Sequence, residues 1–427
     1  MPADTLTQHD HQHPLLGLAA LMRMAYSGVD LAPLGTQLIT LAGPDPVTAN
    51  ANALMDLSTV LQLRGERELA LVMQAQALQL QQIYSPPTTT GLPAIRLLAI
   101  MGPGDLMANT PLEFLLEESD VALDILYVAP DLPLPAELPE HDLLFVAIGE
   151  SAPNQILLQQ VAEAIPSWPR PVLNLPERIA LLSRDSACTL LQSAPGIVMP
   201  STVRIARSTL EQIAHAQFPL QSVLADGAFP LIVRPVDSHA GQGLAKLDDA
   251  AAILDYLQTM EQHEFYISSF IDYRAADGLF RKFRIVLIAG RPYVCHMAIS
   301  EHWMIHYLNA GMAESADKRA EEARFMEHFD DDFARRHATA LHAIYQRTGL
   351  DYLGIDCGET ADGHLLIFEV DSNMIVHAID PVDIFPYKQP QMRKVFSAFR
   401  TMLADTVKLK IPVSHGLTRI NTDGILN

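Results

Sequence analysis

The fold is decided by the stretch Gly354-Ile-Asp-Cys-Gly-Glu359 and by the segment that follows it, Leu365-Leu-Ile-Phe-Glu-Val-Asp-Ser-Asn373. Apolar and polar residues alternate along both segments, and Asp362-Gly363 lies between them. Alternation on either side of an Asp-Gly pair is typical of a β-hairpin. The sequence therefore predicts two short antiparallel strands here.

The oxygen-bearing side chains of this hairpin are expected on one face. Residues two apart in a strand share a face, so Phe368 and Val370 are predicted to point into the core. The carboxylate and amide groups expected on the opposite face are those of Asp356, Glu369, Asp371 and Asn373.

A set of hard oxygen donors on one sheet face suits Mg²⁺, which typically takes one or two carboxylates together with the phosphates of a nucleotide. The alternative is a solvated face with scattered acids. Strand-borne acids flanked by Val, Ile and Phe favour a metal site, because charged groups are seldom placed among such neighbours without a partner.

A second segment, Phe229-Pro-Leu-Ile-Val-Arg-Pro-Val-Asp-Ser-His-Ala-Gly-Gln-Gly243, supplies a candidate phosphate loop. A short apolar strand ends in the cation Arg234, and a loop with Gly241 and Gly243 follows. Glycines let backbone N–H groups close around phosphate oxygens. Alone this signal is weak, since many turns look alike. No Gly-Lys-Ser/Thr follows, and the dinucleotide fingerprint is not matched.

The order of these segments resembles the ATP-grasp superfamily. The phosphate loop is followed by a hinge at residues 266–271, a strand at 283–290 and the acidic hairpin, and the resemblance covers roughly residues 171–405. It implies two α+β subdomains that clamp ATP, so the expected fold class is α/β and α+β. A small parallel-sheet domain and an N-terminal helical domain are expected ahead of the clamp.

The resemblance also implies roles for single residues. Arg234 stands where the family has a phosphate-contacting lysine, Arg284 supports the transferred phosphate, and Lys282 replaces a family aspartate. Asp371 occupies the position of the family's metal-binding Asn, so either Asp371 or Asn373 completes a Mg²⁺ shell with Asp356 and Glu369. The residues expected to act in catalysis are Arg234, Lys282 and Arg284. Those expected to bind ATP are Arg204 (or Arg207), Arg234, Ser238, His239, Gly241, Gly243, Ser268, Phe270, Asp272, Lys282 and Arg284.

The segment His296-Met-Ala-Ile-Ser-Glu-His-Trp-Met-Ile-His-Tyr307 is the candidate for recognising the second substrate. No acid or cysteine arrangement supports reading its histidines as a zinc site. A polar, aromatic wall is favoured, with satisfied structural histidines as the alternative. The residues expected at this wall are His296, Ser300, His302, Trp303, His306 and Tyr307. The charged loop at residues 309–322 is expected to be a mobile lid.

The expected domains are a tetratricopeptide-like helical region at 1–90, an α/β domain at 91–185, and clamp subdomains at 186–263 and 264–427. One such helical repeat cannot bury its own face. The helices are therefore expected to dock on the rest of the chain or on a second subunit in a homodimer.

Composition excludes some classes of protein. Acids outnumber bases 50 to 29 over 427 residues, so a nucleic-acid partner is disfavoured. No apolar run is long enough to span a membrane, and the start of the chain lacks the order of a signal peptide. Cys188, Cys295 and Cys357 are far apart and are expected to be buried thiols in a reducing, cytoplasmic setting.

The resemblance implies an ADP-forming ligase that joins a carboxylate to an amine through an acyl phosphate. Amino acids, peptides and small acids of peptide or natural-product biosynthesis are the candidate substrates. Two alternatives stay open. One is a nucleotide-binding scaffold without catalysis, supported by Arg at 234 and Asp at 371. The other is a small-molecule kinase that uses the same clamp.

Overall fold

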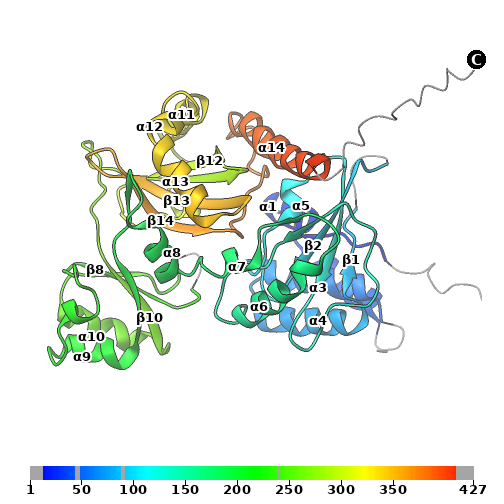
Figure 1. The fold of residues 1–427 in the computed structure, drawn as a ribbon, viewed down its shortest axis with the longest axis horizontal. Coiled ribbons are helices and arrows are strands. Elements are labelled where there is room, and N and C mark those ends of the chain that lie inside the picture. The colour runs from blue at the N-terminus through cyan, green and yellow to red at the C-terminus, as the bar shows by residue number, and fades with distance from the viewer. Residues whose placement is uncertain (1–12, 44–48, 88–91, 239–240, 410–427) are drawn as a thin grey trace, which may run out of the picture.

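The computed structural model describes residues 13–43, 49–87, 92–238 and 241–409, and these contain three β-sheets with helices packed on them (Figure 1). The expected α/β and α+β architecture is confirmed, since a largely parallel sheet precedes two largely antiparallel ones. The boundaries expected at 90, 185 and 263 stay a prediction.

The first sheet has the order β1-β3-β2-β4-β5, with β1 antiparallel and the other pairings parallel. Leu97 and Ala99 of β2 point into one core, and Leu98 and Ile100 into another. Burial of both faces is what parallel sheets require. The strands are β1 Ile83–Tyr84, β2 Ile95–Met101, β3 Val121–Tyr127, β4 Leu143–Val146 and β5 Val172–Leu173.

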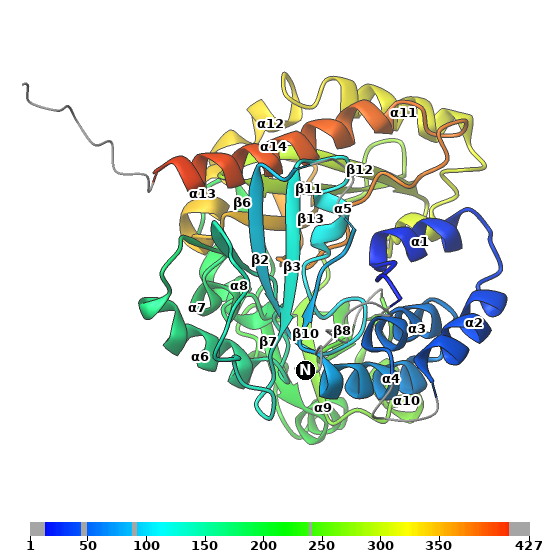
Figure 2. The same cartoon turned by 90° about the vertical axis from the view of Figure 1, so that its right-hand side faces the viewer.

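Helices cover both faces of this sheet (Figure 2). The N-terminal helices share a core with one face and with the C-terminal helix, so they dock on their own chain, one of the two outcomes expected from the sequence. Their likeness to a tetratricopeptide repeat stays a prediction. On this face lie α1 Leu18–Tyr26, α2 Ala32–Ala42, α3 Ala51–Leu63, α4 Arg67–Leu80, α5 Leu112–Leu115 and α14 Lys388–Leu409. On the other lie α6 Gln155–Ala164 and α7 Pro176–Ile179. Helix α8 Arg184–Leu191 lies at the third sheet instead (Figure 1).

The second sheet is small and antiparallel, with the order β7-β10-β8-β9. Two helices cover it and form a core that it shares with neither of the other sheets, at the lower left of Figure 1. Its strands are β7 Thr202–Ala206, β8 Leu231–Pro235, β9 Ala245–Leu247 and β10 Glu264–Ser269, and its helices are α9 Arg207–Ala214 and α10 Ala250–Thr259.

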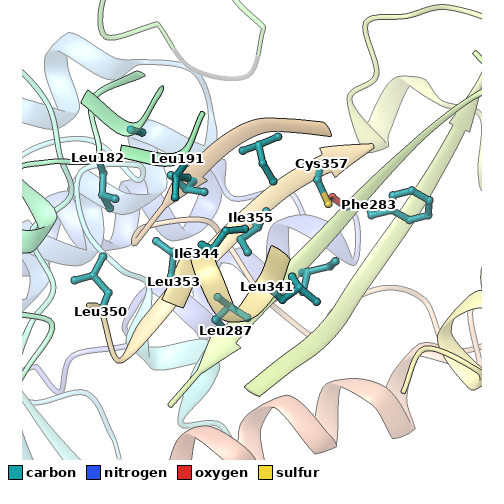
Figure 3. Close-up of a cluster of buried hydrophobic side chains, with 14 of the residues drawn as sticks. Leu182, Leu191, Phe283, Leu287, Leu341, Ile344, Leu350, Leu353, Ile355 and Cys357 are labelled. Carbon is teal, nitrogen blue, oxygen red and sulfur yellow. Dashed lines mark hydrogen bonds between the residues drawn. The ribbon is translucent and has the colours of Figure 1, made fainter. Parts of the chain in front are cut away.

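The third sheet has the order β12-β11-β13-β14-β6 and carries the predicted hairpin. Leu341 and Ile344 pack over Leu287 and Ile355 of the strands in the core that this sheet shares with α8 (Figure 3). The strands are β6 Ile197–Val198, β11 Phe280–Ile288, β12 Arg291–Ser300, β13 Tyr352–Glu359 and β14 Leu365–Asp371. The helices are α11 Ala316–Glu327, α12 Phe333–Arg336 and α13 Ala338–Thr348, and short 3-10 turns occur at Ile165–Ser167, Leu220–Ser222 and Tyr307–Asn309.

The loop expected at 309–322 is wrong over residues 316–322, and a mobile lid stays a prediction. Helix α11 begins at Ala316, inside this segment, and Ser315 caps it by accepting a hydrogen bond from the Lys318 N–H. Glu322 is fully buried, because the helix turns this charged residue toward β12 and the residues near it. A sequence rich in charge was therefore a poor guide to exposure here.

None of the helices in the described ranges has the length and apolar character needed to cross a membrane. The three cysteines are free and buried.

Candidate functional site

A cavity of about 410 Å³ lies where the second and third sheets face each other. Its size falls in the range of about 300–1,000 Å³ typical of small-molecule sites. Although the chain as a whole carries a formal charge of −21, basic side chains outnumber acidic ones around this space. The basic ones are Arg184, Arg234, Lys282, Arg284 and Lys388, and the acidic ones are Asp356, Glu369, Asp371 and Asp380.

A row of four side chains crosses the third sheet on the cavity side. Strand register places Glu369 opposite Asp356, Asp356 opposite Arg284, and Arg284 opposite His296. All four line the cavity. Because directly opposed residues on neighbouring strands lie within about 5.5 Å of each other, the row forms a continuous polar floor.

Asp356 is the most tightly held acid of this floor. The Arg284 guanidinium donates two hydrogen bonds to its carboxylate, at 2.8 and 2.9 Å, and the Lys282 ammonium lies 2.7 Å away. Burial raises the pKa of Asp356, yet Arg284 and Lys282 hold this pKa well below its usual range. Asp356 therefore stays ionised at any physiological pH.

Glu369 and Asp371 differ in their partners. Glu369 forms an ion pair with Arg184. Burial raises the pKa of Glu369, but the charges of Arg184 and Arg234 together bring this pKa below its ordinary value. Asp371 has no such ion pair among the described residues, so burial and the nearby charge of Glu369 raise its pKa to about 7. Two carboxylates that repel each other in this way are set to receive a cation.

The structure separates Asp371 from Asn373. Strand β14 ends at Asp371, which lines the cavity, whereas Asn373 lies past the strand and donates a hydrogen bond to the Met107 carbonyl. Asn373 does not line the cavity, so the expectation that it shares a face with Asp371 is wrong. At a bulge after Asp356, Phe368 packs against the core as expected but also lines the cavity, so the strict alternation expected is interrupted here.

No group of three or more His, Cys, Asp or Glu side chains in the described ranges is arranged to hold a metal unaided. The donors present are the carboxylates of Asp356, Glu369 and Asp371, of which Asp356 is already neutralised by two cations. Glu369 and Asp371 fit Mg²⁺ in its usual mode, in which one or two carboxylates share the ion with phosphate oxygens.

The candidate phosphate loop lies at the end of the cavity where Glu369 is found. Arg234 donates to Ser238, with 3.2 Å between its Nε and the Ser238 Oγ. Burial and the neighbouring Arg184 lower the pKa of Arg234 to about 10, so it stays charged. Gly243 has φ 66°, and a Cβ there would lie 2.8 Å from the Pro235 ring. Ser238 lines an adjoining cavity of about 50 Å³, and Gly241 lines the main one. His239 lies outside the described residues.

The hinge contributes some of the expected nucleotide residues. Ser268 and Phe270 line the cavity, with the Trp303 ring edge-on to Phe270 at 5.7 Å. Asp272 is exposed and pairs with Arg274 outside the cavity.

Two other arginines considered for the nucleotide are engaged elsewhere. Arg204 pairs with Glu264 on the neighbouring strand, at 3.0 Å. Arg207 donates to the carbonyls of Leu257 and Met260, at 2.5 and 2.6 Å, and so holds the end of α10. Neither lines the cavity. Their charge in the sequence did not reveal these structural partners.

The expected substrate wall is partly assembled. His296, Trp303, His306 and Tyr307 line the cavity. Ser300 does not, because its hydroxyl accepts a hydrogen bond from the His302 N–H, and His302 itself is exposed. Burial, with the charges of Arg284 and Lys388, lowers the pKa of His296 well below its ordinary value, so this imidazole is neutral.

Arg184, Lys388 and Tyr26 are among the cavity residues that were missed from the sequence, and so is Asp380. Arg184 meets Glu369 across 185 positions of the chain. Lys388 is the first residue of α14 and Tyr26 is the last residue of α1. In the sequence both look like ordinary surface residues. Only the path of the backbone brings them to the site, and no local pattern marks them.

No family model matches the chain, and no curated protein matches it. Solved structures do. A D-alanine–D-alanine ligase from Bacillus anthracis complexed with ATP is 14% identical, and the match covers 74% of this chain and 98% of that one with a TM-score of 0.43. A RimK-domain ATP-grasp protein from Sphaerobacter thermophilus is 17% identical over 73% and 99% of the two chains, with a TM-score of 0.41. The VanG D-Ala:D-Ser ligase from Enterococcus faecalis is 16% identical over 73% and 99%, with a TM-score of 0.43. ATP-grasp proteins, which the sequence motifs resemble, are thus also found among the structures similar to this chain.

Proposed function

We propose that this chain is an ATP-dependent ligase that activates a carboxylate as an acyl phosphate and joins it to an amine. One observation carries the proposal. A single cavity between two sheets holds Arg184, Arg234, Lys282 and Arg284 around the acids of the β13–β14 hairpin. This combination of clustered cations with carboxylates suited to Mg²⁺ is what a nucleotide's phosphate tail requires.

The four cations would neutralise the negative charge of the nucleotide's phosphates. Arg184 and Arg234 stand at the Glu369 end of the floor, and Lys282 and Arg284 stand at its centre beside Asp356. In phosphoryl transfer the protein acts chiefly by positioning and by stabilising the charge that develops on the transferred group. The adenine is placed against the main chain at Ser268 to Phe270, near the Trp303 ring.

Glu369 and Asp371 would hold Mg²⁺, whose chemistry is to neutralise charge on the terminal phosphates. The ion pair with Arg184 keeps Glu369 ionised for this task. Asp356, by contrast, orients Arg284 and Lys282 toward the cavity.

The proposed chemistry has two steps. An oxygen of the substrate carboxylate bonds to the γ-phosphorus of ATP as the bond to the β–γ bridging oxygen breaks, and ADP leaves. The ammonium group of the amine first gives a proton to water, and the neutral nitrogen then bonds to the acyl carbon. Inorganic phosphate leaves with the oxygen that joined it to that carbon, and the nitrogen loses a second proton to water. Small-molecule or peptide substrates fit a cavity of about 410 Å³. No nucleophilic side chain of the protein takes part.

The test is a screen for ADP and phosphate release over amino-acid pairs and small acids, with mass spectrometry of the product. The proposal requires that ADP and phosphate are released in equal amounts. The product must be heavier than the acid substrate by the mass of the amine minus that of one water molecule. A stable phosphorylated product without free phosphate would assign a kinase instead. Nucleotide binding without ADP under every mixture would assign a scaffold.

The Glu369→Gln variant sharpens this screen. It keeps the shape of the side chain but removes a charge from the hairpin, so ADP release is expected to fall about 100-fold or more while the unfolding transition is kept. Glu327→Gln, on the exposed end of α11, is the matched control and is expected to keep its activity. Undiminished turnover in Glu369→Gln would remove the hairpin from the chemistry.

A further inference from the structure

The cavity continues past His296 into a second end that the nucleotide site does not use. Its walls come from the segment after β14 and from helices α1 and α14. Lys388 of α14 lies here, almost fully buried, with its ammonium over the Tyr307 ring at 3.9 Å. The cavity therefore has two chemically different ends joined by the floor of the third sheet.

Lys388 is fixed between two carboxyl groups. Its ammonium lies 3.1 Å from the Asp380 Oδ2 and 3.7 Å from Glu322, and it donates to the Tyr307 hydroxyl at 2.5 Å. Glu322 is saturated, because it also accepts from the Met297 N–H and from the hydroxyls of Tyr307 and Tyr387.

Asp380 has unused hydrogen-bonding capacity. Within the part of the chain that the structure describes, its only ion pair or hydrogen bond is the contact of its Oδ2 with Lys388. The Lys388 ammonium contacts Asp380 through the Oδ2 atom alone. The free Oδ1 is therefore available to a cation in the cavity, which Asp380 lines.

Helix α1 closes this end. Its last residue, Tyr26, lines the cavity and lies edge-on to His377 with 5.5 Å between the ring centres. Asp380 acts on the Tyr26 phenol, since burial and the charge of Asp380 raise the pKa of Tyr26. An aromatic ring beside a free carboxylate oxygen is a common setting for an ammonium group.

The position of α1 is fixed from both sides. Asp56 of α3 accepts hydrogen bonds from the backbone N–H groups of Leu16 and Gly17, at 2.7 and 3.0 Å. Glu113 of α5 accepts one from Ala19 at 3.0 Å. Ala19 also packs in one apolar cluster with Ile379, next to Asp380. The N-terminal helical region thus forms part of the cavity wall.

We propose that this end of the cavity is the subsite for the amine substrate, with Asp380 receiving its ammonium group and Tyr26 of helix α1 limiting its size. The inference rests on the ligase function proposed above. The substrate class is a compact primary amine with an apolar body, because Val376 and Met392 line the same end. The N-terminal helices are then a specificity element of the enzyme and not merely a docked module.

The test separates the two ends of the cavity. The nucleotide end is probed with the non-hydrolysable analogue AMP-PNP and Mg²⁺, and the other end with isobutylammonium chloride against neutral isobutanol, each by its shift of the thermal unfolding midpoint. With AMP-PNP present, isobutylammonium but not isobutanol is expected to stabilise the protein. Asp380→Asn is expected to weaken this effect at least tenfold while AMP-PNP binding is unchanged. Asp383→Asn, an exposed acid in the same segment, is the control and is expected to behave as the wild type.

Tyr26→Ala supplies an independent variant outside the buried network. It is expected to admit 2-phenylethylammonium, which the wild type excludes, with unchanged AMP-PNP binding. Equal isobutylammonium binding in Asp380→Asn and wild type, or no binding of either amine while AMP-PNP binds, would overturn the inference and leave the ligase proposal standing. Failure of AMP-PNP to bind the wild type would overturn both.

Discussion

Arg284 and Asp356 face each other on β11 and β13 and form a two-pronged ion pair, with N–O distances of 2.8 and 2.9 Å, at the centre of the cavity floor. The pair is asymmetric in burial, since the Asp356 side chain is 2% exposed and that of Arg284 is 22% exposed. The Asp356 carboxylate is thus the buried partner, and the Arg284 guanidinium is the partner exposed to the cavity. A second cation, Lys282, contacts the same carboxylate. One buried acid therefore orients two cations that line the cavity.

Replacing Arg284 by Met is expected to destabilise the fold. The change leaves the buried Asp356 carboxylate with Lys282 alone, and removal of one partner of a buried pair typically costs about 3–5 kcal/mol. Because Lys282 remains, we expect about 3 kcal/mol, measured by urea unfolding. Arg291→Met, at an exposed position at the start of β12, is the control and is expected to stay within about 0.5 kcal/mol of the wild type. Equal stability of the two variants would show that Asp356 does not depend on Arg284.

Arg184→Met is expected to weaken nucleotide binding. Arg184 lines both the main cavity and the adjoining cavity of about 50 Å³, and it forms an ion pair with Glu369. The substitution removes one cation that would contact the phosphates and leaves the Glu369 carboxylate without this partner. A hydrogen bond to a charged group is worth about 1.5–3 kcal/mol, which corresponds to at least about a tenfold rise in Kd for AMP-PNP. Titration calorimetry measures this, with the exposed Arg178→Met of α7 as control. An unchanged Kd in Arg184→Met would place the phosphates elsewhere.

The sequence predicted the strands well and the partners of charged groups poorly. The hairpin, with its turn at Gly363, and strand β2 lie where alternation and β-propensity put them, because both are local properties. The bulge after Asp356 is not local, since it depends on the register with a second strand, and the sequence did not predict that Phe368 would line the cavity as well as pack against the core.

Long-range contacts explain the other misses. Glu322 was expected in a lid, but it accepts hydrogen bonds from Tyr307 and Tyr387, which are far apart in the chain. Arg184 and Lys388 reach the site through the same kind of contact between distant segments. Charge in a sequence marks a group that needs a partner, and only the fold shows which partner it has.

The acids that hold helix α1 are expected to make stability fall as pH rises. Burial raises the pKa of Asp56 to about 6 and that of Glu113 to about 7, above their ordinary values of 3.8 and 4.5. The folded state then binds these protons more tightly than the unfolded state. Their contribution is full below about pH 4 and is lost as pH rises through about 7. The Asp56→Asn/Glu113→Gln double variant is expected to lack this part of the pH dependence.

Thermal unfolding between pH 4 and pH 8 checks this expectation. The difference in midpoint between wild type and double variant should change by about 10 °C or more across the range. The two raised pKa values together correspond to about 6 kcal/mol, and about 1 kcal/mol moves the midpoint by about 2–4 °C in domains of about 150–250 residues. Subtracting the variant's midpoint removes the contributions of other titrating groups to the pH dependence. One of these is Asp356, whose lowered pKa makes stability rise with pH. If the difference in midpoint is the same at every pH, Asp56 and Glu113 have the same pKa values in the folded and the unfolded state, and the expectation is wrong.

Trp303 is expected to report nucleotide binding by its fluorescence. The chain has two tryptophans, and they differ in place. Trp303 lines the cavity beside Phe270, whereas Trp168 packs on the parallel-sheet side and donates to the His141 ring at 3.1 Å. Trp168→Phe should therefore keep the emission change caused by AMP-PNP with Mg²⁺, and Trp303→Phe should lose it while still binding the analogue by calorimetry. A signal that instead follows Trp168 would place the adenine away from the hinge at Ser268 to Phe270, because only a ring next to the base changes its surroundings when the nucleotide enters.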